Sequence, residues 1–166
     1  MVNLSDIVRF EKLEDRITAQ LIATLEHSQR DRVLSKFFEL FDFEYDGEDA
    51  DFQLQVQEYE SRPDAMIQSE SFLIYIEVKL GDAIDSAQIE SHFEGGKGKK
   101  PRFVVLCITA GLDQPKGIKE ATTRLQAKGE SPDIRWISWK RIYGIIKDMV
   151  NTRNDDKPSF PKTSVT

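Results

Sequence analysis

The sequence is poor in cysteine and histidine and has no long apolar run. Cys107 is the only cysteine among 166 residues, and there are two histidines. One cysteine cannot build a disulfide framework, and these three side chains are too few for a typical structural zinc site. No stretch approaches the length of a membrane span, and the first residues lack the basic-then-apolar pattern of a secretory signal. We therefore expect a cytoplasmic protein without membrane segments, disulfides or structural zinc.

Length and composition predict one domain with a sizeable core. Apolar residues make up 39% of the chain and charged residues 31%, which is ordinary for a globular protein. No internal repeat is present. We assign a single domain to residues 1–150 and expect residues 151–166, which are polar and contain two prolines, to form a loose tail.

The net charge of -6 is unevenly distributed along the chain. From Glu39 to Glu60 there are nine acidic residues and no Lys or Arg, so 23 basic residues face 20 acidic ones in the remainder. Basic residues gather at 97–102 and again at 140–147. A local basic patch can bind phosphates although the total charge is negative, so charge neither establishes nor excludes DNA binding.

Hydrophobic periodicity predicts alternating helices and strands. Helices are expected over 5–28, 30–41, 83–93 and 116–128, and a last helix opens at Ser138 or Trp139. Strands are expected over 51–60, 64–68, 72–80, 103–109 and 134–138, the first three as a meander. The stretch 103–109 is continuously apolar, which is typical of a strand covered on both faces and parallel to its neighbour. Residues 94–101 are expected to form a loop.

The stretch from Phe72 to Leu80 predicts a buried central strand with two charges at its end. Its faces alternate as Phe72, Ile74, Ile76 and Val78 against Leu73, Tyr75, Glu77 and Lys79. Burying Glu77 and Lys79 costs several kcal/mol per ion unless partners compensate. An exposed edge-strand pair is the alternative interpretation, which the apolar length of the strand disfavours.

One strand earlier, Asp64 follows Pro63, so neighbouring strand ends can bring two carboxylates and a lysine together. Pro63-Asp64, then Glu77-Val78-Lys79, with Gln88 on the next helix, resembles the motifs of the PD-(D/E)xK nuclease superfamily. The resemblance covers residues 10–110. It implies an α/β fold with a restriction-endonuclease-like α-β-β-β-α-β core and a mixed central sheet, followed here by an extra C-terminal helix-strand-helix.

Hydrolysis of a phosphodiester needs an activated water and neutralisation of charge at the phosphate, and Mg²⁺ on carboxylates serves both needs. The resemblance implies Mg²⁺, with Mn²⁺ as a substitute, bound by Asp64, Glu77 and the backbone carbonyl of Val78. It also implies that Lys79 holds the attacking water or the developing negative charge. Gln88 would position this lysine or the substrate backbone.

Glu14 lies in the middle of the apolar stripe of the first predicted helix. Five apolar residues point within about 60° of it: Ile7, Phe10, Ile17, Leu21 and Leu25. A lone carboxylate in such a stripe calls for a partner or a metal. The superfamily commonly has a glutamate on its first helix facing the site, so we assign Glu14 rather than Glu11 to a second ion or to a water-mediated contact. A salt bridge with Lys79 or with an arginine is the alternative.

Two further patterns resemble known loops and are rejected. The segment 42–53 starts like an EF-hand loop, but Gln53 stands where the bidentate glutamate belongs. The glycines of 94–101 do not have the spacing of a phosphate-binding loop.

Nucleic-acid contacts are expected from the basic loop at Lys97, Lys99, Lys100 and Arg102, with a solvated loop as the alternative. His92, one turn beyond Gln88, would face the substrate as an acid or hydrogen-bond donor, or would be a partly exposed histidine without a catalytic task.

The pattern as a whole predicts a metal-dependent endonuclease or exonuclease. DNA is the expected substrate, and RNA is also compatible with the pattern. No element that reads base sequence is recognisable, which favours structure-selective or partner-directed cleavage. Cleavage of both strands by one site per chain would favour a homodimer. The alternative is a catalytically idle binding module that docks a partner through the acidic stretch 39–60 or the basic loop 97–102. An acidic DNA mimic is a remoter alternative, since the acidic charge is confined to one stretch.

Overall fold

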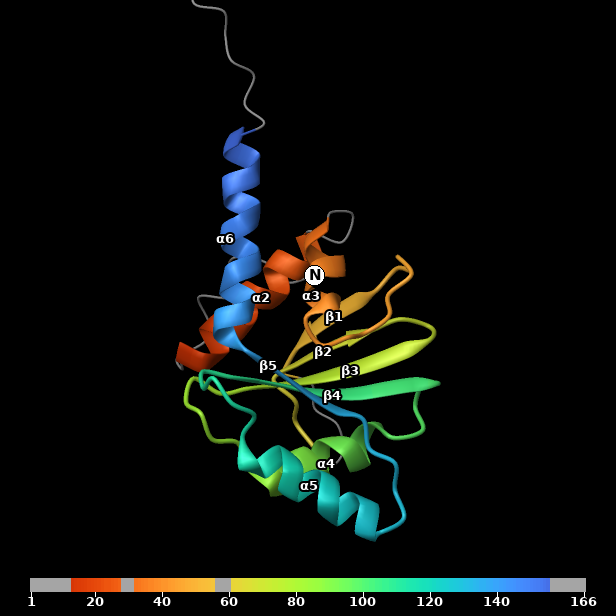
Figure 1. Cartoon of the computed structure of the whole chain (residues 1–166). Helices are drawn as coiled ribbons and strands as arrows, with labels where there is room; N and C mark the ends of the chain where they lie inside the picture. The colour runs from red at the N-terminus through yellow and green to blue at the C-terminus, as the bar shows by residue number, and fades with distance from the viewer. Residues whose placement is uncertain (1–12, 28–31, 56–60, 156–166) are drawn as a thin grey trace, which may run out of the picture.

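The computed structural model describes residues 13–27, 32–55 and 61–155, and its centre is one open mixed sheet (Figure 1). Five strands lie in the order β1-β2-β3-β4-β5. Their bounds are Asp51–Leu54 for β1, Ala65–Gln68 for β2, Phe72–Val78 for β3, Arg102–Thr109 for β4 and Ile134–Ser138 for β5. Five helices flank this sheet in the described part: α2 (Leu13–His27), α3 (Arg32–Glu39), α4 (Ser86–Gly96), α5 (Lys116–Ala127) and α6 (Trp139–Asp155).

The first three strands form a meander and the last two join by crossovers. β1 pairs antiparallel with β2, and β2 antiparallel with β3. The hairpin between β2 and β3 turns at Ser69, whose hydroxyl oxygen accepts from the backbone N–H groups of Ser71 and Phe72 at 3.2 Å each. α4 and α5 then return the chain so that β3, β4 and β5 run parallel. The expected meander and the expected parallel pairing of 103–109 are both confirmed.

Strand alternation divides the core into two layers. Phe72, Ile74, Ile76 and Val78 pack with α2, α3 and α6. Residues of the opposite parity, such as Tyr75 and Cys107, face α4 and α5. Figure 1 shows α4 and α5 together on one side of the sheet and the other three helices on the other. Every residue of β3 is buried, as expected for a central strand covered on both faces.

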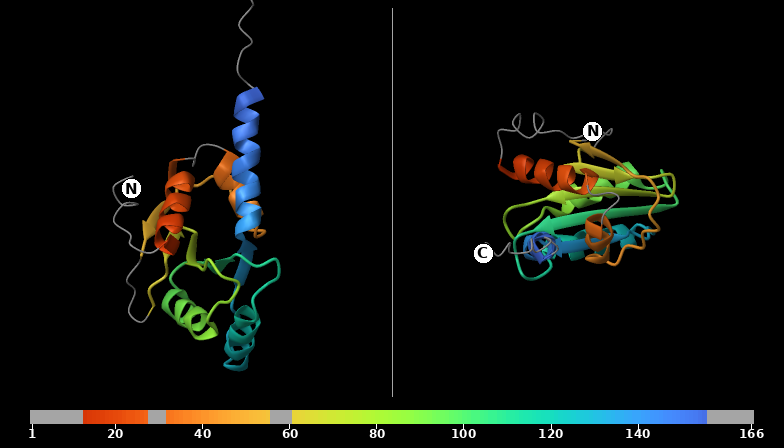
Figure 2. Two further views of the ribbon diagram at one scale, coloured as in Figure 1. Left: turned by 90° about the vertical axis from the view of Figure 1, so that its left-hand side faces the viewer. Right: turned by 90° about the horizontal axis from the view of Figure 1, so that it is seen from above.

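Several boundaries differ from the expectations. β1 ends at Leu54, Gln55 has a positive φ of 47°, and residues 56–60 of the expected strand lie outside the described residues. The first part of the expected first helix, residues 5–12, also lies outside them. α6 continues to Asp155, into the stretch expected as a tail, and projects from the body of the protein (Figure 2). Within the described chain no helix is long and apolar enough to cross a bilayer.

The expected loop 94–101 is shorter than predicted because α4 runs on through Gly96. Its glycines serve close packing here. A Cβ on Gly95 would lie 3.0 Å from Ser61 Cβ, and a Cβ on Gly96 would lie 2.2 Å from the Phe103 ring. The two glycines let α4 approach the sheet more closely than any other residue type would allow.

Substitution of Gly96 by Ala should therefore destabilise the protein by about 1–3 kcal/mol, because the new methyl group overlaps the Phe103 ring. Gly144 in α6 is the matched control, since a Cβ there meets nothing within 4 Å. Gly144→Ala should stabilise the helix by up to about 1 kcal/mol. Urea unfolding of both variants measures the difference, and an equal effect of the two would contradict the close packing.

Candidate active site at the end of the central strand

Glu77 is a fully buried carboxylate in the most enclosed strand of the sheet. Its exposed fraction is 0%, and β3 lies between β2 and β4. It shares a face with Tyr75 and lies opposite Cys107 of β4, toward α4. An isolated charged carboxylate at such a position would be strongly disfavoured, so the charged form of Glu77 needs partners that compensate for its burial.

Two cationic or hydrogen-bonding side chains contact the Glu77 carboxylate. His92 Nε2 lies 2.7 Å from Oε2, and Lys79 Nζ lies 3.1 Å from Oε1. The contact between Lys79 and Oε1 is an ion pair. Beyond this ion pair, Oε1 has no hydrogen-bond partner among the described residues. A buried oxygen in this state calls for an explanation.

Asp64, the residue before β2, reaches the end of β3. Its Oδ2 accepts a hydrogen bond from the backbone N–H of Val78 at 2.8 Å. Burial and the nearby Glu77 carboxylate raise the pKa of Asp64 to about 7, although the Val78 N–H and the Lys79 ammonium act in the opposite direction. Two neighbouring carboxylates that disfavour each other's charge are one of the arrangements that perturb pKa values at functional sites.

Glu14 comes from α2 and completes the same edge. Its Oε2 accepts from the backbone N–H of Leu80 at 3.0 Å. Burial lowers the pKa of Lys79, but the carboxylates of Glu77, Asp64 and Glu14 outweigh burial, and the pKa lies above its ordinary value. Lys79 is therefore charged and surrounded by three carboxylates from three separate elements.

The register of β2 and β3 explains why the backbone N–H and C=O of Val78 have no ladder partner in β2. The last ladder pair is Ala65 with Ile76, and continuing the register would place Val78 opposite Pro63. Proline has no N–H to donate, so the Val78 carbonyl has no ladder partner on that side. The N–H and C=O of one strand residue point to the same side. The Val78 carbonyl therefore faces the edge at which Asp64 holds its N–H.

His92 is buried, contrary to both interpretations of it from the sequence. Its exposed fraction is 1%, so it can neither contact a nucleic acid nor stand partly in solvent. Its second ring nitrogen, Nδ1, lies 2.6 Å from Ser61 Oγ. No pattern in the sequence pointed to Ser61, because its partner lies 31 residues away.

Ser61, His92 and Glu77 have the residue types of a hydrolase triad without its arrangement. In such triads the histidine Nε2 faces the serine, whereas here Nδ1 does. Ser61 is only 4% exposed, which leaves no approach for a substrate carbonyl. We exclude a nucleophilic role for this serine.

Gln88 is not part of the cluster formed by Glu14, Asp64, Glu77 and Lys79. It is half-buried on α4, and it forms no hydrogen bond to the candidate site within the described ranges. The sequence placed it one turn before His92 on the same helix, and it is His92 that contacts Glu77.

The basic loop lies at the opposite end of the sheet. Arg102 stands in register with Phe72, the first residue of β3, so roughly 20 Å of strand separates it from Lys79. Lys97 also forms ion pairs with Glu94 and Glu130 at 2.7 and 2.6 Å, and Arg102 donates to the carbonyl of Glu44 at 2.8 Å. Lys99 lies 3.4 Å from the hydroxyl of Tyr75.

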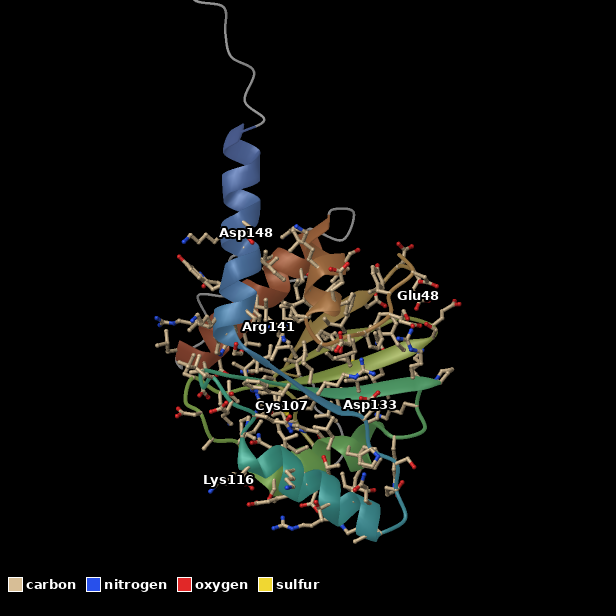
Figure 3. All side chains as sticks on the ribbon, viewed as in Figure 1. Glu48, Cys107, Lys116, Asp133, Arg141 and Asp148 are labelled. Carbon is tan, nitrogen blue, oxygen red and sulfur yellow. The ribbon has the colours of Figure 1, made fainter. Side chains whose placement is uncertain are left out.

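The loop residues Lys97, Lys99, Lys100 and Arg102 therefore do not line the candidate site. The sequence could not show this, because parallel pairing decides which strand ends coincide. Figure 3 shows the two ends of the sheet apart, with Arg141 and Lys116 toward one and Glu48 and Asp133 toward the other.

The raised pKa of Asp64 predicts a pH dependence of stability in the absence of metal. The folded state keeps a proton up to about pH 7 that the unfolded chain releases near pH 4, so stability should fall as the pH rises through this window. Asp64→Asn removes this titration. In EDTA the variant should be more stable than the wild type at pH 8, by about 1–3 kcal/mol, with the difference shrinking toward pH 4. Urea unfolding at several pH values measures it.

The exposed Asp113 offers a control, since Asp113→Asn should change stability little at either pH. If the wild type were more stable than Asp64→Asn at pH 8 without metal, the raised pKa of Asp64 would be contradicted.

Comparisons with known proteins do not identify a relative of this chain. No family model matches the chain, and no curated protein and no solved structure matches it significantly. The chain is therefore not assigned to a family on similarity, and the candidate site rests on the contacts among Glu14, Asp64, Glu77 and Lys79.

Proposed function

We propose that this chain is a metal-dependent phosphodiesterase of the PD-(D/E)xK type that cleaves DNA. The observation that carries the proposal is the meeting of Asp64, Glu77 and Lys79 at the end of β3, with the buried Glu77 Oε1 left without a hydrogen bond. The ion pair with Lys79 offsets part of the cost of burying the Glu77 charge, and a bound cation would add to that compensation.

The order of elements supports the same family type. From α3 onward the chain runs helix, three antiparallel strands, helix, and a strand parallel to the third. The restriction-endonuclease-like core implied by the resemblance would have the same order, with α5, β5 and α6 as extra C-terminal elements. The charged residues lie where β3 ends and β2 begins, at the carboxyl end of the parallel strands, where ligands commonly bind in α/β sheets.

The donor set fits a hard divalent cation. Asp64, Glu77 Oε1 and the Val78 carbonyl are oxygen donors, and Glu14 would reach a second ion or a bound water. The described residues contain no group of three or more acidic, His or Cys side chains gathered for a metal. Mg²⁺ does not need one, because it is commonly held by one or two carboxylates with waters and substrate oxygens in the remaining positions.

A bound Mg²⁺ or Mn²⁺ would supply charge neutralisation at the phosphate and a water of lowered pKa. The chain's own residues then divide the remaining tasks. Lys79, 30% exposed at its side chain, presents its ammonium to the attacking water or to the developing negative charge. A cation held by Asp64 and Glu77 would relieve the repulsion that, together with burial, raises the pKa of Asp64.

Phosphate contacts are better placed on α6 than on the basic loop. α6 begins at the site's end of the sheet, where Trp139 Nε1 donates to the carbonyl of Lys79 at 3.2 Å. The next two residues, Lys140 and Arg141, are exposed and form no ion pair within the described part of the chain. These cations lie beside the site and would accompany a nucleic-acid backbone entering it. RNA and DNA share this backbone chemistry.

The acidic stretch is less suited to docking a partner than the sequence suggests. Phe43 is buried in the core, and Glu48 Oε1 accepts hydrogen bonds from the hydroxyls of Ser69 and Ser71. Arg135 donates to the carbonyls of Phe41 and Asp42 at 3.0 and 2.8 Å. These contacts tie the stretch to the sheet and give it a structural task.

Lys79→Ala should lower cleavage of DNA at least about a hundredfold with Mg²⁺, as loss of a group that stabilises transition-state charge commonly does, while Mn²⁺ still binds. Glu77→Gln should lose both Mn²⁺ binding and cleavage. Nuclease assays and isothermal titration with Mn²⁺ measure the two properties. Lys100→Ala, at the far end of the sheet, is the control and should leave both unchanged. Equal cleavage by the wild type and Lys79→Ala would remove Lys79 from the mechanism.

Pro63→Ala tests the role of the Val78 carbonyl. Alanine supplies the N–H that proline lacks, and this donor would compete with the metal for the carbonyl. We expect Mn²⁺ to bind roughly tenfold more weakly, the equivalent of one hydrogen bond of about 1.4 kcal/mol. Pro132→Ala, before β5, should have no effect. Unchanged affinity in Pro63→Ala would show that the carbonyl is not a ligand.

A further inference from the structure

The buried pair of His92 and Ser61 has no role in the chemistry described so far. His92 lies on the sheet-facing side of α4, and both of its ring nitrogens are engaged, Nε2 by Glu77 Oε2 at 2.7 Å and Nδ1 by Ser61 Oγ at 2.6 Å. All three side chains are less than 5% exposed. A buried imidazole with two short polar contacts holds one orientation and restrains whatever it contacts.

The chemistry of the partners determines where the protons lie. A carboxylate only accepts hydrogen bonds, so His92 Nε2 must carry a proton and donate it to Glu77 Oε2. In the neutral ring Nδ1 is then an acceptor, and the Ser61 hydroxyl donates to it. Because its Nε2 is occupied in this way, His92 cannot itself be a metal ligand through that nitrogen.

We propose that His92, held by Ser61, is a positioning residue that fixes the Glu77 carboxylate so that Oε1 faces a divalent cation. This inference rests on the proposed metal site. The contact to Oε2 prevents rotation of the carboxylate, and Oε1 lies 3.1 Å from the Lys79 ammonium, with no further hydrogen-bond partner among the described residues. Partners of this kind, one step removed from the metal, orient its ligands and commonly contribute ten- to a hundredfold to metal affinity.

Local packing around Ser61 is arranged for this contact. Gly95 lies on α4 one turn after His92, and a Cβ on Gly95 would lie 3.0 Å from Ser61 Cβ and 4.0 Å from the Tyr75 ring. Glycine at this position lets Ser61 come close to the helix, within reach of His92. Ser61 itself stands three residues before Asp64, so the same segment delivers a metal ligand and the group that holds the histidine.

The first experiment reads the proton positions without any metal or substrate. The chain has only two histidines, so ¹⁵N-histidine NMR in EDTA distinguishes His92 from His27 once His27→Gln removes one set of signals. We expect His92 to carry its proton on Nε2, with Nδ1 accepting a hydrogen bond, and Ser61→Ala to shift the Nδ1 signal. A neutral ring protonated on Nδ1 would overturn the inference.

The second experiment measures Mn²⁺ affinity by isothermal titration on variants whose folding is checked by circular dichroism and urea unfolding. His92→Phe, which keeps a ring without hydrogen bonds, should bind Mn²⁺ ten- to a hundredfold more weakly. His92→Gln, which retains a donor toward Glu77, should stay within about threefold of the wild type. His27→Gln, on α2 away from the site, is the matched control and should be unchanged.

Ser61→Ala keeps the histidine and serves if His92→Phe does not fold; it should weaken Mn²⁺ binding about three- to tenfold.

The outcomes separate this inference from the proposed function. If Glu77→Gln loses Mn²⁺ binding while His92→Phe and Ser61→Ala bind like the wild type, the positioning role is wrong and the metal site stands. If the wild type binds Mn²⁺ no better than Glu77→Gln, the metal site is wrong and the positioning role falls with it. Weak binding by His92→Gln as well as His92→Phe would point to a packing defect and would also overturn the positioning role.

Discussion

A carboxylate with no solvent exposure in the central strand is the constraint around which this protein is arranged. Burial of the Glu77 charge costs several kcal/mol unless neighbours compensate. His92 satisfies one oxygen and Lys79 lies beside the other, and these two groups come from a helix and from the strand itself. Beyond the ion pair with Lys79, Oε1 has no hydrogen-bond partner among the described residues, and the proposed metal site rests on this oxygen.

The site also depends on a gap in the sheet. β2 begins at Ala65, so Val78 at the end of β3 has no ladder partner on that side, and its N–H donates to Asp64. Two residues beyond β3, the N–H of Leu80 donates to Glu14. Pro63 stands where the ladder would continue, and its missing N–H prevents the gap from closing. An interrupted pairing next to a buried strand thus leaves backbone N–H groups to the carboxylates of Asp64 and Glu14.

Parts of this arrangement were predictable from local pattern. Glu77 and Lys79 two residues apart on a buried strand must share a face, and Glu14 in an apolar stripe must point inward, whatever the rest of the chain does. The basic loop and His92 show where such reasoning ends. The loop was expected to contact nucleic acid because it is basic, with a solvated loop as the alternative, and the parallel pairing of β3 with β4 places it at the other end of the sheet from Lys79. His92 was expected in solvent or at the substrate, and the close approach of α4 through Gly95 and Gly96 buries it.

The amino-acid sequence by itself determined the order of helices and strands, the burial of β3 and the faces of its charged residues, because each depends on a periodicity of a few residues. Only the tertiary structure decided which side chains meet. The contact of His92 with Ser61 spans 31 residues and that of Glu14 with Leu80 spans 66. Contacts of such separation depend on strand register, crossover direction and the distance between a helix and a sheet, none of which is encoded in a local pattern.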